Sequence, residues 1–358
     1  MKTYSLKLFV AMAVMVSLVA FSGCDDNEND NQVDETLNAG ILEDFSEYVA
    51  QSSYNELKVK AEDLYNDILA LEVTPSNENL AACQDSWRAA RQSWEQTESF
   101  LFGPVATDDI DPRIDTWPVN FEDLEDQLAS QNEFDENYID GLEDALKGFH
   151  PIEYLIFGED GEKVGADLTD REIEYLKGLA LNLKDLTSNV AASWDPAAGD
   201  SYHTKFVTAG NGSAVYGTQR AAFEELVSAM AGICEEVGDG KMGEVLLDVN
   251  GEESPYSMNS LTDFTNNMKG VLNVYVAKNS GNSLEDLVKE HNLSLDSDIK
   301  AAINATITAL DNLQEEGKTF EQITDEKPVQ VQNAIDAINA LKEALETQLL
   351  PFVQQHSN

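Results

Sequence analysis

Basic side chains are scarce in this chain. Its 358 residues include 22 Lys and Arg against 67 Asp and Glu, which gives a formal net charge of −45 at pH 7. Because such an acidic surface repels nucleic acids and anionic headgroups, a nucleic-acid-binding function is excluded. Hydrophobic residues make up 42% of the chain, so it can bury a core despite its charge. Cation binding and solubility remain as roles for the acidic surface.

Several catalytic signatures are missing as well. The sequence contains no His-Glu-x-x-His, no Gly-x-Ser-x-Gly and no Gly-x-x-x-x-Gly-Lys-Ser/Thr. These absences argue against the usual zinc-protease helix, a serine-hydrolase elbow and a P-loop. With only four histidines, a metal site has to use carboxylates, and an oxygen-rich site with one imidazole suits iron, manganese, calcium or zinc.

The N-terminus resembles an export signal. Lys2 and Lys7 precede the apolar run 8–21, which is too short to span a membrane. The following Ser-Gly-Cys24 resembles a bacterial lipoprotein cleavage box. We expect residues 1–23 to be a signal peptide, Cys24 to be lipidated and residues 24–36 to form an acidic tether. The mature protein would be anchored in the bacterial outer membrane, with display on the outer face as a further expectation.

Convincing strand patterns are absent, and apolar residues from Ile41 onward follow helical spacing. The clearest stripe predicts one helix between Pro75 and Gly103, and a capping-box pattern opens another at Thr169. Further helices are expected at about 213–237, 257–278, 295–316 and 331–349, and non-helical stretches at 103–118 and 250–256. The fold class is therefore all-α, with two packed helical-bundle domains at 37–198 and 199–358. We expect Cys83 and Cys234 to be separate buried thiols, although an exported compartment permits a disulfide.

Three segments could carry chemistry. His150 and Glu153 are three residues apart, so on a helix they could share one cation, or they could act as a capping-box pair ahead of Pro151. The loop 103–118 carries four aspartates, which repel one another unless a cation or Arg113 lies among them. Arg91 and Glu95 are spaced as a surface ion pair. The four aspartates are Asp108, Asp109, Asp111 and Asp115.

Taken in order, these segments resemble the imelysin-like family. The similarity covers about residues 40–350, and its hallmark Gly-x-His-x-x-Glu is filled by Gly148, His150 and Glu153. The matching stretches are Trp87-x-x-x-Arg91-x-x-Trp94-Glu95-x-x-Glu98, Phe102-Gly-Pro104, 110–118, 148–158, 253–257, 259–263 and 270–275.

The resemblance implies an exported, all-α, two-domain protein associated with bacterial iron acquisition, with a metal site at His150 and Glu153. We accordingly expect a lipoprotein that binds iron or an iron-carrying ligand for uptake, with zinc as another candidate metal and an outer-membrane transport protein as a partner. Asp115 and Glu98 are expected to complete the metal ligands. Five further residues are expected around the ligand: Asp111, Arg113, Trp117 as a packing wall, and Ser254 and Asn259 on the opposite wall.

Two other functions are compatible with the sequence. The family carries a peptidase label, so a metal-dependent peptidase with Glu153 as base or ligand is the alternative, although the motif marks only two of the usual three protein ligands. A non-catalytic interaction module that docks a surface protein is the third hypothesis, in which His150 would only cap a helix.

Overall fold

The structure of the protein is a computed structural model, and it describes residues 33–246 and 252–358. Within these ranges the ordered segments are helices and no β-strand occurs, which confirms the predicted all-α class. The predicted signal peptide and Cys24 lie outside the described residues. The first helix, α1 Glu35–Asp44, begins one position before the predicted end of the acidic tether.

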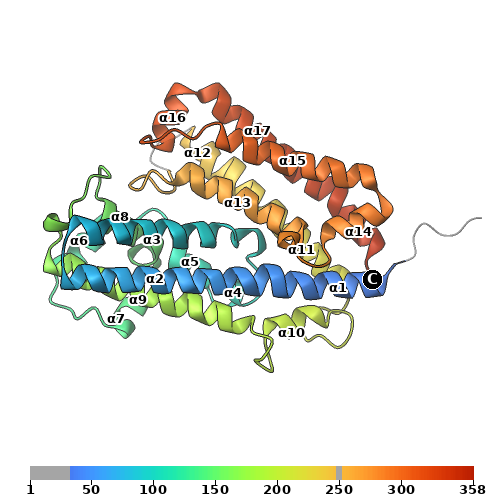
Figure 1. Cartoon of the computed structure of the whole chain (residues 1–358), viewed down its shortest axis with the longest axis horizontal. Coiled ribbons are helices and arrows are strands. Elements are labelled where there is room, and N and C mark those ends of the chain that lie inside the picture. Colours follow the sequence, from blue (N-terminus) through green and yellow to red (C-terminus); the bar gives the residue numbers. More distant parts are fainter. Residues whose placement is uncertain (1–32, 247–251) are drawn as a thin grey trace, which may run out of the picture. The chain divides into compact units, whose positions relative to one another are not determined.

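Three long helices form one bundle: α2 Ser52–Val73, α3 Asn77–Glu95 and α9 Asp170–Ser193. They run side by side in Figure 1, with α2 in contact with both of the others. The hydroxyl of Ser76 caps α3, and the predicted stripe of Leu80, Trp87 and Trp94 is buried. Thr169 and Glu172 form the predicted capping box of α9. The apolar faces and helix starts of this bundle are thus those that the sequence indicates.

A second group of long helices follows along the chain: α11 Gln219–Glu235, α13 Ser260–Tyr275, α15 Leu293–Asp311 and α17 Pro328–Ala344. Helix α13 contacts α15 and also packs on α3 (Figure 1). The approach to α3 is close, because a Cβ on Gly270 would lie 2.6 Å from the carbonyl oxygen of Gln96. This contact brings α13 against the end of α3, where the candidate site lies.

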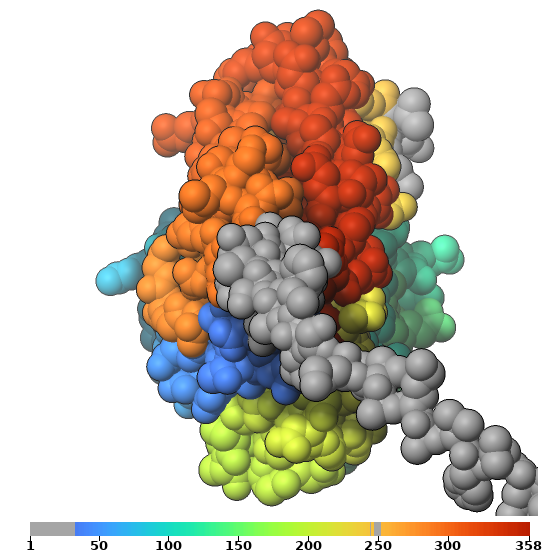
Figure 2. Space-filling view, turned by 90° about the vertical axis from the view of Figure 1, so that its right-hand side faces the viewer, coloured from blue at the N-terminus to red at the C-terminus, as the bar shows by residue number. Residues whose placement is uncertain are grey.

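Shorter helical segments connect and cover the long ones. In Figure 2, α1 (blue) lies between α10 (yellow-green) and α14 (orange), both of which it contacts. The α-helical segments are α4 Pro104–Thr107, α5 Ile110–Asp115, α6 Phe121–Ala129, α7 Glu136–Asp140, α8 Phe149–Phe157, α10 Tyr202–Val207, α12 Gly243–Val245, α14 Leu284–His291, α16 Phe320–Glu326 and α18 Leu350–His356. Three π-helices (η1 Phe45–Gln51, η5 Glu236–Met242 and η8 Leu345–Leu349) and four 3₁₀ turns (η2 Glu98–Phe100, η3 Asp144–Leu146, η4 Gly165–Asp167 and η7 Ala277–Asn279) complete the described elements.

Two predictions of local structure were wrong. The stretch 103–118 is not a plain loop, because α4 and α5 lie within it. The helix predicted to reach Gly103 ends at Glu95, and its last predicted turn is the 3₁₀ turn η2, followed by Leu101 outside any helix. Glu98, the first residue of η2, is buried and accepts a hydrogen bond from the amide of Asn267 on α13.

Cys83 and Cys234 are buried free thiols, as predicted. No helix in the described part of the chain is both long and apolar enough to cross a bilayer. Residues 33–358 form one compact unit, and the predicted boundary between residues 198 and 199 stays a prediction.

Candidate metal centre

Helix α8 begins within the hallmark segment, at a close contact between Gly148 and the backbone of Ile114. Gly148 precedes the helix with φ of 84°, and a Cβ there would lie 2.5 Å from the carbonyl carbon of Ile114. Only glycine fits this approach, which places the start of α8 directly beside the end of α5. His150, on α8, therefore faces Asp115, the last residue of α5.

The capping-box alternative for the hallmark was wrong. The residue that precedes α8 is Gly148, and no side chain caps this helix. His150 is the second residue of the helix rather than its cap. Its imidazole and the carboxylate of Glu153 thus remain available for other contacts.

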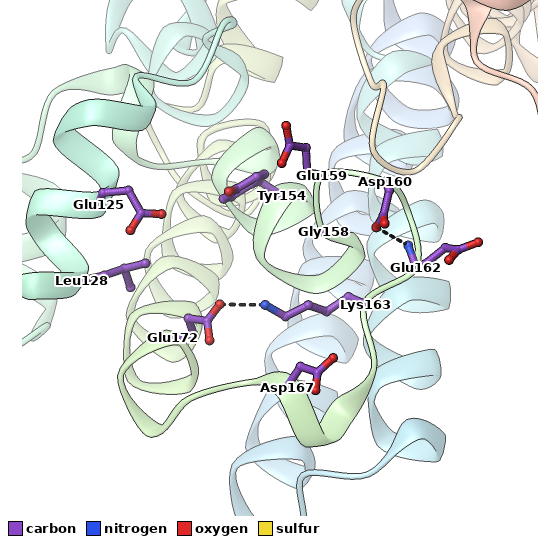
Figure 3. A pocket seen from close by; sticks show the side chains of 10 residues that line it. All are labelled: Glu125, Leu128, Tyr154, Gly158, Glu159, Asp160, Glu162, Lys163, Asp167 and Glu172. Carbon is purple, nitrogen blue, oxygen red and sulfur yellow. Dashed lines mark hydrogen bonds and ion pairs between the residues drawn. The ribbon is translucent and has the colours of Figure 1, made fainter.

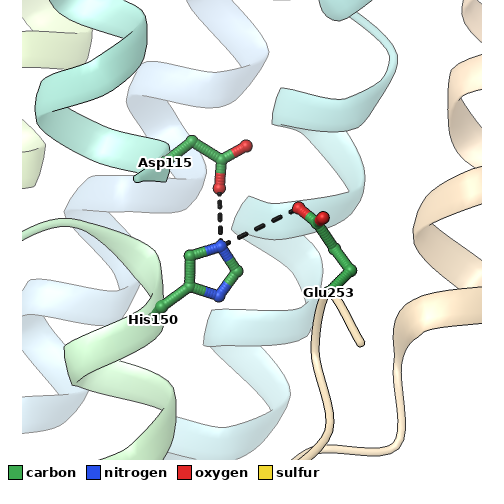
Figure 4. A group of neighbouring side chains, drawn as sticks. All are labelled: Asp115, His150 and Glu253. Carbon is green, nitrogen blue, oxygen red and sulfur yellow. Dashed lines mark ion pairs between the residues drawn. The ribbon is translucent and has the colours of Figure 1, made fainter. Parts of the chain in front are cut away.

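His150 is fully buried and has a carboxylate on each side of its ring. Its Nε2 lies 3.1 Å from Asp115 Oδ1 and 3.8 Å from Glu253 Oε1 (Figure 4), while Nδ1 lies 3.5 Å from Glu153 Oε2. Burial lowers the pKa of His150, but its contacts with the carboxylates of Asp115 and Glu153 raise it more, to about 9. The surrounding carboxylates thus favour the protonated imidazole.

A residue from the second half of the chain, Ser257, holds the carboxylate of Glu153 in place. Its Oε1 accepts hydrogen bonds from the backbone nitrogen of Ser257 at 2.8 Å and from the hydroxyl of Ser257 at 2.7 Å. Its Oε2 has no hydrogen-bond partner and is directed at His150. The arrangement orients the imidazole and leaves Nε2 directed at Asp115 and Glu253.

The guanidinium of Arg91 lies at the centre of the acidic cluster. It binds Asp115, contacts Glu95 and Glu253 at 2.6 Å each, and approaches Asp263 at 3.7 Å. Arg91 and Glu95 are fully buried, so the prediction of a surface pair was wrong. Burial alone raises the pKa of Asp115, but the charge of Arg91 and the contact with His150 keep it below its ordinary value.

The cluster contains more acidic than basic groups. Six carboxyl side chains, each no more than 6% exposed, surround three basic ones. Burial raises the pKa of Glu98 and of Asp263 well above normal, and the charge of Glu95 adds to both shifts. These shifts favour the protonated forms of Glu98 and Asp263, and a multivalent cation would stabilise their ionised forms instead. The acids are Glu95, Glu98, Asp115, Glu153, Glu253 and Asp263, and the bases are Arg91, His150 and Lys241.

A cavity of about 380 Å³ opens beside this cluster. Four of the predicted site residues line it, together with Glu253 and Lys241 from the second half of the chain. Burial and the charge of Asp115 raise the pKa of Asp111 to about 7. The ring of Trp117 lies 5.0 Å from that of His150, as expected of a packing wall. The four predicted residues are Glu98, Asp111, Asp115 and Trp117.

Other predicted residues lie elsewhere. Arg113 pairs with Asp140 near the surface instead of neutralising the neighbouring aspartates, because Arg91 already occupies that position. Asp108 and Asp109 are exposed. Asn259 reaches the cluster only through a 2.6 Å hydrogen bond to Asp263, and it lines a separate hollow. Ser254 is fully buried beside Asp263, whose pKa burial raises and the Ser254 side chain partly lowers, and its backbone nitrogen donates to the hydroxyl of Ser260.

Sequence reasoning missed four groups of the site: Glu253, Asp263, Lys241 and Asn267. The amide of Asn267 binds Glu95 at 2.7 Å and Glu98 at 2.6 Å. These residues lie about 90 to 120 positions from the hallmark, so spacing could not place them. The one available signal was that Glu253 and Asp263 fall inside segments that resemble the family.

A further hollow of about 460 Å³ contains no comparable group. Its cation, Lys163, is paired with Glu172 at 2.8 Å (Figure 3). None of the residues that line it has a buried polar atom lacking a partner. We therefore assign no site to this hollow. Its lining is Glu125, Leu128, Tyr154, Gly158, Glu159, Asp160, Glu162, Lys163, Asp167 and Glu172.

Known proteins share this architecture. The family model of imelysin, also designated peptidase M75, matches residues 50–348. An iron-regulated protein A of Synechococcus elongatus is 29% identical over 341 residues, covering 93% of this chain and 90% of that protein.

Two solved structures have the same fold. One, named as an iron-regulated protein A precursor from Parabacteroides distasonis, has a TM-score of 0.79 and 26% identity over 90% of this chain and 95% of that one. The other, an imelysin-like protein from Psychrobacter arcticum, has a TM-score of 0.71 and 12% identity over 90% and 97% of the two chains. With the family model covering most of its length, the chain belongs to the imelysin family.

Proposed function

We propose that this protein binds iron, as the ion or in a small chelate, at the group formed by Asp115, His150 and Glu253, and that it serves iron uptake. The observation that carries the proposal is the convergence of these three side chains, whose ligand atoms all lie within 4.8 Å of one another. The group lies in a buried cluster with an excess of carboxylates and beside a cavity. The relatives named for regulation by iron support the choice of metal.

The donor set fits this chemistry. Two carboxylates and one imidazole suit iron, manganese or zinc better than copper(I). Glu153 would hold Nδ1 of His150 and so present Nε2 to the metal, which is the usual arrangement around a metal-binding histidine. Both ring nitrogens of His150 are buried and have no hydrogen-bond partner among the described residues. Glu98 and Asp111 face the same cavity and could supply further oxygens.

Calorimetric titration with ferrous iron, under anaerobic conditions, tests this proposal. We expect one ion per chain in the wild type and loss of at least about 100-fold in affinity for His150→Gln, because a ligand is removed. Glu153→Gln is expected to weaken binding by about tenfold, since it removes the partner that orients the imidazole.

His203→Gln is the matched control, since His203 lies on α10 away from the cluster, and its affinity should equal that of the wild type. Circular dichroism would confirm that all variants are folded. Equal iron binding by wild type and His150→Gln, or none by either, would contradict the proposal.

We propose in addition that the protein acts at the cell envelope as a lipoprotein anchored in the outer membrane through Cys24. The support is the sequence: a basic start, a short apolar run and a cysteine after Ser-Gly, followed by acidic residues. Cys24→Ser is expected to abolish incorporation of labelled palmitate and to release the protein from sedimented membranes. Retention of both label and membrane association in Cys24→Ser would exclude this anchor.

A further inference from the structure

Lys241 lies at the mouth of the acidic cluster. Its side chain is 15% exposed, and its Nζ lies 3.2 Å from Glu253 Oε1 and 3.7 Å from Glu98 Oε1. The same nitrogen lies 3.2 Å from Glu236 Oε1, whose side chain is 48% exposed. Lys241 is thus held between two buried carboxylates on one side and a solvent-facing one on the other.

A local feature of the backbone creates this placement. Lys241 and Glu236 lie five residues apart in the π-helix η5, which continues α11. Because a π-helix bonds each residue to the fifth one along, side chains at this spacing lie on the same face. The lysine can therefore exchange its buried partners for Glu236 by rotating its own side chain, with no movement of the backbone.

The acceptor of Lys241 is also a candidate metal ligand. Oε1 of Glu253 lies 3.2 Å from Nζ and 3.8 Å from Nε2 of His150. An ammonium and a metal ion at these distances would repel each other strongly and compete for one oxygen atom. Lysine in its observed position and a metal on Glu253 are therefore mutually exclusive.

We propose that Lys241 is the exchangeable cation of the metal site and sets its affinity and charge selectivity, because an entering metal has to displace its ammonium toward Glu236. Arg91, which is fully buried and lies 2.6 Å from the same oxygen of Glu253, is the fixed cation and stays in place. The inference rests on the proposed metal-binding function and adds a selectivity residue to it. A monovalent cation that displaced the lysine would only replace one positive charge by another. A divalent or trivalent ion brings more positive charge to this acid-rich cluster than the lysine it displaces, so the exchange favours multivalent ions.

Two substitutions separate the role of the charge from that of the side-chain length. Lys241→Met keeps the side-chain length and removes the competing charge. If about one tenth of the wild-type molecules have the lysine displaced at any time, the apparent affinity of the wild type is reduced about tenfold, so ferrous iron should bind about tenfold more tightly to Lys241→Met. Lys241→Arg keeps the charge and should retain the wild-type affinity within about threefold. Glu236→Gln removes the outer partner and should weaken binding.

Displacement is measured directly by the reactivity of the lysine. Acetylation of Lys241 by an N-hydroxysuccinimide ester, followed by peptide mass spectrometry, should become faster when ferrous iron is added, because Nζ moves into solvent. Lys147 is the internal reference: its side chain is 4% exposed and its Nζ binds two backbone carbonyls away from the cavity. Its acetylation should not respond to iron.

The outcomes distinguish this inference from the proposed function. Tighter binding by Lys241→Met together with iron-dependent acetylation of Lys241 supports displacement. If the wild type binds iron but Lys241→Met binds it no more tightly, the inference about Lys241 is wrong. The same holds if iron does not change the acetylation rate of Lys241. Neither result contradicts the proposed metal site. Absence of iron binding in both wild type and Lys241→Met overturns the two together.

Discussion

Replacing Arg91 by methionine is expected to lower the free energy of unfolding by about 3–5 kcal/mol, the usual effect of removing one partner from a buried ionic network. Arg91 is fully buried and faces four carboxylates: Asp115, Glu95, Glu253 and Asp263. Burial lowers the pKa of the guanidinium, but these carboxylates raise it well above normal. Methionine fills most of the volume of the arginine side chain. The loss of stability therefore results from the uncompensated carboxylates rather than from a cavity.

Urea denaturation of the wild type and the variant measures this effect. Arg113→Met is the matched control, because Arg113 pairs with Asp140 in a partly exposed position and should cost less than about 1 kcal/mol. Adding Glu95→Gln to Arg91→Met should recover part of the loss, since one uncompensated acid is removed. Equal stability of Arg91→Met and Arg113→Met would show that the cluster does not depend on the guanidinium.

The network of carboxylates around Arg91 illustrates why the fold could be predicted from the sequence better than the site. The stripe of Leu80, Trp87 and Trp94 and the capping box at Thr169 are local patterns, and both correspond to helices in the structure. Local spacing also predicted that Arg91 and Glu95 pair. It carried no information about burial, which results from α13 packing on α3 and from the segment around Glu253.

The site itself was predicted in part, from the half of the chain that contains the hallmark. Asp115, Glu98, Asp111 and Trp117 line one cavity with the hallmark histidine beside it. Lys241 could not be assigned from the sequence, because its position depends on a π-helix that no residue pattern signals. Arg113 was a reasonable partner for the aspartates by sequence proximity, but Asp115 pairs with the buried Arg91 and Arg113 pairs with Asp140.

The hallmark glycine has a purely steric role that leads to the second large effect. Gly148→Ala is expected to lower the free energy of unfolding by about 3 kcal/mol or more, because it combines a strained positive φ with a contact that the backbone cannot relieve. The added Cβ would meet the backbone of Ile114 at the end of α5. To remove this overlap α8 has to move away, which separates His150 from Asp115. Iron affinity should therefore fall even in the fraction that stays folded.

Gly212→Ala tests a positive φ without the contact. Gly212 has φ of 88°, close to the 84° of Gly148, but its added Cβ would meet nothing within 4 Å. It should therefore cost only the backbone strain, about 1–2 kcal/mol, and leave iron affinity unchanged. Urea denaturation and iron titration of both variants test this difference. If the two substitutions cost the same and both retain iron binding, the contact between α8 and α5 does not determine the geometry of the site. If only Gly148→Ala loses iron affinity, the glycine of the hallmark is required because it lets His150 reach Asp115.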